Sequence, residues 1–128
     1  MDERTMEVVN RFSKSWNDTE KFIDSLIDNH HGFDKLVPFR QFISNLKQAG
    51  EDKYFRLGTF MHDLSFSRSV NDRLRDDQKY IKVEAIAIDD FEITLRDGKK
   101  IYRQYRVNNL TDKKMTDLLK TLKHTLVD

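Results

Sequence analysis

The feature that most constrains the fold is a change in the spacing of apolar residues, which occurs twice along the chain of 128 residues. Up to Gly50 the apolar residues recur every three or four positions, as on one face of an α-helix. Between residues 54 and 107 they alternate with polar residues, as in half-buried strands, and from residue 111 the helical spacing returns. This order predicts an α+β fold with N-terminal helices, a five-stranded antiparallel meander sheet and a C-terminal amphipathic helix packed on the sheet.

The first 50 residues are predicted to form two helices. The apolar stripe of the first runs from Met6 to Ile27 and stays in phase across residues 17–20, which look like a capping box. Either one continuous helix or two shorter ones would fit residues 3–29, and we favour one because the stripe is unbroken. Pro38 suits the first turn of the next helix, and Gly50 suits its end.

The first hairpin of the sheet is expected to turn at His62-Asp63. This turn would pair Met61 with Leu64 and would place the apolar side chains of both strands on one face. The three alternating serines that follow would then lie on the solvent face; they are Ser65, Ser67 and Ser69.

The strand over residues 80–88 is apolar on both sides, so we expect it to be central and covered on both faces. Asp97-Gly98 is the strongest hairpin signal in the chain. A two-residue loop would set Ile93 against Tyr102. A three-residue loop with Gly98 in the left-handed position would set Ile93 against Ile101, and we prefer it because Ile101 then joins the core face.

The last helix is expected to begin at a Thr111 cap and to bury a stripe from Met115 to Leu126. A hairpin turned by Asp-Gly and followed by a capped amphipathic helix is similar to the close of pleckstrin-homology-like barrels. The resemblance covers about residues 80–126 and concerns only the order of elements, because the N-terminal helices do not fit it. It therefore implies no function.

Composition bounds the organisation of the chain. Charged residues make up 35%, but an aromatic content of 11% argues against a disordered polyampholyte. One Pro and four Gly leave little material for linkers, so we expect one domain over residues 1–128. Within it, residues 1–50 would be helical, residues 54–107 would form the sheet, and residues 111–126 would form the closing helix.

A net charge of +1 gives no global attraction to nucleic acid or to anionic membranes. The chain has no Cys, which excludes disulfides, thiolate metal sites and a cysteine nucleophile. We see no signal peptide and no apolar run approaching the ~20 residues that span a bilayer. We therefore expect a soluble, cytoplasmic protein with no membrane contact.

Two arginines break the apolar pattern of their strands. Arg68 and Arg103 both alternate in phase with apolar residues, and a turn at Asp89-Asp90 would bring Glu84 to the same face. Because a buried charge needs a partner, the favoured interpretation is an ion pair between Glu84 and one or both arginines, or stems that extend to the sheet edge. The alternative is an anion-binding or enzymatic cleft lined by the three residues, which Arg suits through its planar guanidinium.

Residues 96–106 form a basic hairpin that includes two tyrosines. Five Lys or Arg against one Asp give it a local net charge of +4. Basic side chains bind backbone phosphates and aromatic side chains stack on bases, so binding of single-stranded nucleic acid is one hypothesis. The competing interpretation, which we favour, is that the lysines guard a sheet edge against aggregation.

The exposed residues that we expect to contact a partner are Phe60, Arg73, Leu74, Arg75 and Tyr102. We find no catalytic, metal-binding or cofactor-binding motif, and no two of the four histidines are spaced i, i+4. The expected function is a small non-enzymatic protein-interaction module, with a bacterial immunity or antitoxin-type protein that neutralises a partner as its most concrete form. The partner is expected to be another protein, and the sequence leaves the oligomeric state open.

Overall fold

The computed structural model describes residues 3–29, 32–70 and 78–125. Its three α-helices are α1 (Glu3–Asn29), α2 (Val37–Gln48) and α3 (Lys113–Lys123). Two 3₁₀ turns, η1 (Asp34–Leu36) and η2 (Glu51–Lys53), flank α2. α1 is one unbroken helix, as the continuous apolar stripe predicts, and residues 17–20 lie in its interior. Pro38 lies in the first turn of α2, and Gly50 follows that helix with a φ of 80°.

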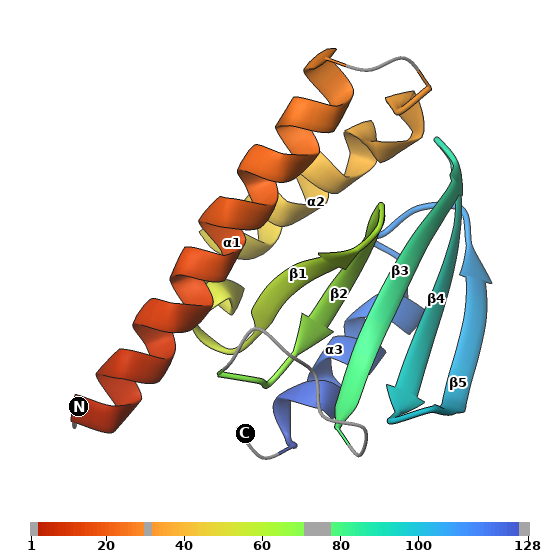
Figure 1. The fold of residues 1–128 in the computed structure, drawn as a ribbon. Coiled ribbons are helices and arrows are strands. Elements are labelled where there is room, and N and C mark those ends of the chain that lie inside the picture. Colours follow the sequence, from red (N-terminus) through yellow and green to blue (C-terminus); the bar gives the residue numbers. More distant parts are fainter. Residues whose placement is uncertain (1–2, 30–31, 71–77, 126–128) are drawn as a thin grey trace.

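The five strands form one antiparallel meander sheet in the order β1-β2-β3-β4-β5, which confirms the predicted fold class. The strands are β1 (Arg56–Phe60), β2 (Asp63–Ser67), β3 (Lys79–Ala87), β4 (Asp90–Asp97) and β5 (Lys100–Val107). β1 and β5 are therefore the two edges of the sheet. Figure 1 shows α1 and α2 side by side beyond β1, with α3 behind the sheet.

The first hairpin turns one residue earlier than the sequence suggests. Phe60 pairs with Asp63, so the turn residues are Met61 and His62, and Thr59 rather than Met61 faces Leu64. The predicted pairing of Met61 was therefore wrong. The error leaves the faces unchanged, because moving the turn by one residue shifts the cross-strand partner by two. Met61 adopts a left-handed conformation with a φ of 55°. Methionine rarely adopts this conformation, so the residue type does not predict the turn.

The β4–β5 hairpin has the predicted left-handed glycine but a different register. Asp97 pairs with Lys100, and Gly98 has a φ of 64°. A bulge then shifts the ladder so that Ile93 faces Tyr105 instead of Ile101. The side chain of Ile101 is consequently 46% exposed, and its predicted place in the core was wrong.

β3 is central, as predicted, but only one of its faces is fully covered. Ile81 and Val83 are buried, whereas Ile86 is 41% exposed and Ile88 is 57% exposed. A register shift between Ala85 and Ala87 ends the regular pairing with β4 and carries these isoleucines to the end of the strand. Apolar residues at a strand end can therefore imitate the pattern of a doubly covered strand.

The hydrophobic core lies on the sheet face that α2 and α3 cover. Phe42 of α2 packs edge-on against Phe66 of β2, and Phe39 packs against Phe91 of β4, each at a centroid distance of 6.0 Å. Four buried residues of α3 complete the same cluster; they are Met115, Leu118, Leu119 and Leu122.

The three serines do not face solvent. Ser65 is 8% exposed and Ser67 is 2% exposed, and Ser69 is also buried, so their predicted exposure was wrong. The register supplies the reason for Ser67, because its direct neighbours are the longer side chains of Arg56 and Tyr80. Short side chains between long cross-strand neighbours lose contact with water without a second layer of structure.

α3 begins one residue later than expected. Asp112, not Thr111, is its N-cap, and its carboxylate accepts a hydrogen bond from the Lys114 backbone at 2.9 Å. The Thr111 hydroxyl instead donates to the side chain of Asn109 at 2.6 Å. Both residues are good caps by type, so composition alone does not choose between them. The predicted end of the stripe, Leu126, lies outside the described residues.

Candidate functional site

The β1 edge of the sheet is sealed by side chains of α1. The Leu57 backbone N–H donates to the Ser15 hydroxyl at 3.0 Å, and the Leu57 carbonyl accepts from the Thr19 hydroxyl at 3.1 Å. One turn of α1 thus supplies the donor and the acceptor that a neighbouring strand would provide. The indole N–H of Trp16 donates to the Phe55 carbonyl at 2.8 Å. This edge has no backbone available at Leu57 for a further strand.

Sequence reasoning missed this seal. Ser15 and Thr19 are 6% exposed, and they lie one helical turn apart on either side of Trp16. Two small hydroxyl residues at i and i+4 beside a buried indole are a recognisable signal of hydrogen bonding away from the helix. Thr19 also fits the apparent capping box of residues 17–20, and that pattern masks its role.

The opposite edge, β5, lies open. Among the described residues no strand other than β4 pairs with β5. Residues 100–104 are all exposed, including Ile101 and Tyr102, whose exposed fractions are 46% and 55%. An unpaired edge with exposed apolar residues is a template for another strand. The two edges of this sheet therefore differ: side chains of α1 occupy the backbone of β1, whereas no further strand pairs with β5 in the described residues.

Cations surround the open edge. Arg103 places its guanidinium 4.7 Å from the ring centroid of Tyr102, and Lys114 of α3 places its ammonium 5.5 Å from that of Tyr105. Among the described residues, neither cation has a carboxylate within ion-pair distance, and the same holds for Lys100 at the start of β5. The edge therefore carries positive charge that the described part of the chain does not neutralise.

Arg106 is the exception on β5, because its guanidinium is bidentate on Asp90 with N–O distances of 2.5 and 2.7 Å. The hydrogen bond from Arg106 holds the pKa of the Asp90 carboxyl below its ordinary value of 3.8. The same hydrogen bond raises the pKa of the Arg106 guanidinium above its ordinary value. This pair fastens the end of β5 to β4, whereas Lys100 and Arg103 lie closer to the start of the strand.

The predicted cluster of Arg68, Glu84 and Arg103 is not assembled. Arg103 faces Leu95 in the register, on the core side of its strand as predicted. Glu84 faces Glu92, one position out of phase with the buried Val83 and Ala85, so it lies on the other face of the sheet. The bulge in the β3–β4 ladder explains the difference, because the predicted turn at Asp89-Asp90 assumed unbroken alternation. The register separates Glu84 from Arg103.

Arg68 binds carbonyl oxygens instead of a carboxylate. Its Nε donates to the Thr125 carbonyl at 3.2 Å, and its NH1 donates to the Tyr54 carbonyl at 2.6 Å. Partial burial lowers the pKa of the Arg68 guanidinium below its ordinary value. Arg68 thereby joins the chain after α3 to the start of β1, and it acts as a structural clamp between distant segments.

Of the residues predicted to contact a partner, Phe60 and Tyr102 are exposed. Phe60 is 40% exposed, and its ring packs on Tyr80 at 5.6 Å between centroids, on the sheet face opposite to that of the buried Leu57. Tyr102 lies at the open edge. The other three, Arg73, Leu74 and Arg75, lie outside the described residues.

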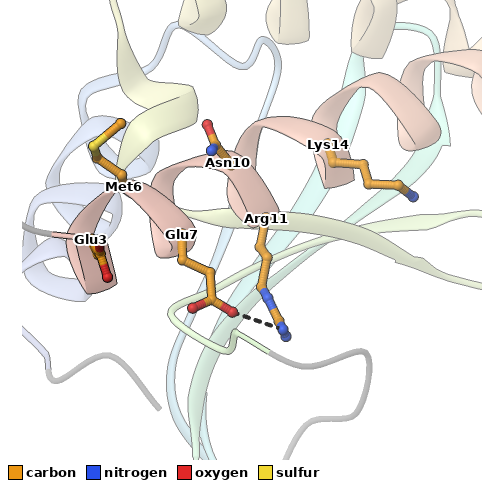
Figure 2. Close-up of a pocket in the computed structure, with 6 residues that line it drawn as sticks. All are labelled: Glu3, Met6, Glu7, Asn10, Arg11 and Lys14. Carbon is orange, nitrogen blue, oxygen red and sulfur yellow. Dashed lines mark ion pairs between the residues drawn. The ribbon is translucent and has the colours of Figure 1, made fainter.

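Two surface hollows are less suited to specific binding. The larger, of about 440 Å³, is lined in the described residues by α1 alone, and Figure 2 shows its side chains with the Arg11–Glu7 ion pair at 3.0 Å among them. A smaller hollow of about 270 Å³ lies between α2 and α3 over Phe42 and Leu119. Its Lys123 is already paired with Glu51 at 2.8 Å, and its volume is below the ~300 Å³ at which ligand pockets usually begin.

Within residues 3–29, 32–70 and 78–125, no three His, Cys, Asp or Glu side chains gather in the way that metal ligands do. No helix in these ranges is both long enough and apolar enough to span a bilayer. Comparisons with family models, with curated proteins and with solved structures found no match for the chain.

Proposed function

We propose that this chain is a non-enzymatic protein-interaction domain that binds an extended segment of another protein along the open edge of β5. The observation that carries the proposal is the contrast between the two sheet edges. Ser15 and Thr19 occupy the backbone of β1, whereas β5 leaves its edge and two apolar side chains exposed. Strand addition combines backbone hydrogen bonds with contacts to alternate side chains, and both are available at β5.

An immunity or antitoxin-type protein that neutralises its partner by capping one of the partner's strands is the most concrete form of this proposal. The compact, charged surface and the uncovered strand are compatible with such a role. The proposal does not depend on that role, because the same edge would serve any partner with an accessible extended segment.

Nucleic-acid binding is the competing function, and the unneutralised cations beside Tyr102 favour it. The outer face of the same strands weakens it. Glu84 and Glu92 stand opposite each other there, next to Arg106, so the face carries charges of both signs and is not the continuous basic surface that a phosphate chain requires. An enzymatic or anion-binding cleft around Arg68, Glu84 and Arg103 has no geometric support, since the register places Glu84 and Arg103 on opposite faces.

The test is an unbiased selection of peptides from a random displayed library, followed by mapping on variants. We expect selected peptides to lose at least about tenfold in affinity to Tyr102→Lys, as truncation of an aromatic hot spot does. The matched control is Ile88→Lys, an equally exposed apolar residue at the far end of the sheet, which should leave affinity unchanged. Peptides that respond only to Ile88→Lys, or steeply salt-dependent binding of a single-stranded oligonucleotide with no selected peptide, would overturn the proposal.

A further inference from the structure

We infer that the segment received by β5 is acidic and alternates carboxylate with aliphatic side chains. This inference rests on the proposed function, because it names the chemistry of the partner at the same edge. Two independent properties of the edge carry it: the sign of the charges that have no partner, and the exposed apolar surface between them.

The charge argument concerns three cations from two elements. Lys100 and Arg103 belong to β5, and Lys114 reaches the strand from α3 by packing on Tyr105. None has a carboxylate partner among the described residues. An added strand lies ~5 Å from β5, so its side chains would come within direct reach of these cations. Carboxylates at those positions would be attracted, and lysines would be repelled.

The apolar argument concerns the bulge of β5. Arg96 pairs with Ile101 and Leu95 with Arg103, so Tyr102 is the extra residue. Ile101 and Tyr102 are both about half exposed. A neighbouring strand would cover them with alternate side chains. Aliphatic residues between the carboxylates would bury this apolar surface, whereas a uniformly acidic segment would leave it exposed to water.

A second copy of this chain is the other obvious occupant, and charge excludes it. Antiparallel pairing of two β5 strands would bring the Lys100 and Arg103 side chains of the two copies together. Like charges directly opposite each other destabilise a sheet, and exposed cations are a known protection of edges against self-pairing. The basic edge therefore disfavours pairing with a second copy of the chain and favours pairing with an acidic segment.

The experiment titrates the full chain with four synthetic octapeptides in low salt. The first is (Glu-Val)4, the second (Thr-Val)4 and the third (Lys-Val)4. The fourth is (Glu-Val)4 carrying N-methyl groups on two adjacent central residues, which removes backbone donors from both edges of the peptide. We expect (Glu-Val)4 to bind at least about tenfold more tightly than (Thr-Val)4, and (Lys-Val)4 not to bind. The N-methylated peptide should lose most of the affinity.

Charge-reversal variants locate the effect. Lys100→Glu combined with Arg103→Glu should reverse the order, so that (Lys-Val)4 binds and (Glu-Val)4 does not. The matched control is Lys120→Glu combined with Lys113→Glu, two exposed lysines of α3, and it should keep the wild-type order. Circular dichroism of each variant verifies that it is folded.

The outcomes separate this inference from the proposed function. Equal affinity for the acidic and neutral peptides, with loss on N-methylation, would overturn the acidic partner and leave strand addition intact. Equal affinity for the plain and N-methylated acidic peptides would overturn strand addition itself. Sedimentation that shows a β5-dependent dimer of the free chain, abolished by Arg103→Glu, would assign the edge to a second copy and overturn the inference.

Discussion

At the scale of single residues, the two arginines that break the apolar pattern have different roles. Arg68 is partly buried and donates to two carbonyls on distant segments, whereas Arg103 is exposed and contacts the ring of its neighbour Tyr102. Both fit a single sequence pattern, namely an arginine in phase with apolar residues. What separates them is the position of their strands in the sheet, because Arg68 follows an interior strand and Arg103 lies on an edge.

This difference predicts unequal effects of the same substitution. Arg68→Met should lower the free energy of unfolding by about 1–3 kcal/mol, because it leaves the Tyr54 and Thr125 carbonyls without their donor. Arg103→Met should change it by less than about 0.5 kcal/mol, as exposed substitutions do. Urea denaturation of the two variants measures both values. An Arg68→Met protein as stable as the wild type would contradict the clamp.

The Asp90–Arg106 pair predicts a dependence on pH. The folded-state pKa of Asp90 is depressed, so its contribution to stability is fully present above the unfolded-state value near 3.8 and is lost as the pH falls through the lower folded-state pKa. Asp90→Asn should therefore be less stable than the wild type at pH 7, and the gap should narrow below pH ~4. Thermal melts of both proteins between pH 7 and 2.5 test this. A gap that stays constant with pH would show that the ion pair contributes nothing.

At the scale of elements, α1 substitutes for a sixth strand at the β1 edge. Its hydroxyl groups occupy the Leu57 backbone, and the indole of Trp16 occupies the Phe55 carbonyl. The helix therefore protects a strand edge by hydrogen bonds from side chains to backbone, in addition to covering it with apolar surface. The unpaired edge of β5 stands in contrast to β1, where side chains of the same chain occupy the edge backbone.

The hydrogen bond from Thr19 to β1 predicts that this side chain contributes more to the free energy of unfolding than a threonine that bonds only within its own helix. Thr19→Val keeps the shape of the side chain but leaves the buried Leu57 carbonyl without that donor, and it should cost about 1–2 kcal/mol. Thr121→Val is the matched control, because the exposed Thr121 hydroxyl donates to the Asp117 carbonyl within its own helix at 3.0 Å. It should cost less than about 0.5 kcal/mol. Equal losses in chemical denaturation would argue against the seal.

The order and type of the elements follow from the sequence, and the register does not. Periodicity identifies the long α1 and the alternating strands because burial on one face imposes it over many residues. A turn, in contrast, depends on the backbone conformation of one or two residues. Met61 adopts a left-handed conformation, which its residue type does not predict. Bulges at Ile86 and Tyr102 add errors that alternation cannot detect, and these decide where Glu84 and Ile101 point.

The candidate site was predicted only in part, for the same reason. Tyr102 and the basic hairpin stood out from the sequence, and the structure places them on an edge strand. That β1 is closed and β5 open depends on the packing of α1 against a strand about forty residues later in the chain. No local pattern carries that information.

At the scale of the whole molecule, one hydrophobic cluster contains residues of α1, α2, all five strands and α3. The chain should therefore unfold as a single domain in one cooperative transition. Circular dichroism at 222 nm and Trp16 fluorescence, followed along the same urea titration, should give coincident curves. If the two midpoints separated, the helices and the sheet would be independent folding units.

The central claim is that one edge of the sheet is closed and the other receives a partner. Hydrogen–deuterium exchange of individual backbone amides, measured for the free protein and with saturating (Glu-Val)4, tests it most directly. We predict that the Leu57 amide is protected in both states, while the β5 amides that point away from β4 exchange rapidly in the free protein and become protected with the peptide. Unchanged exchange along β5, with new protection on the α2–α3 surface or on α1, would contradict it.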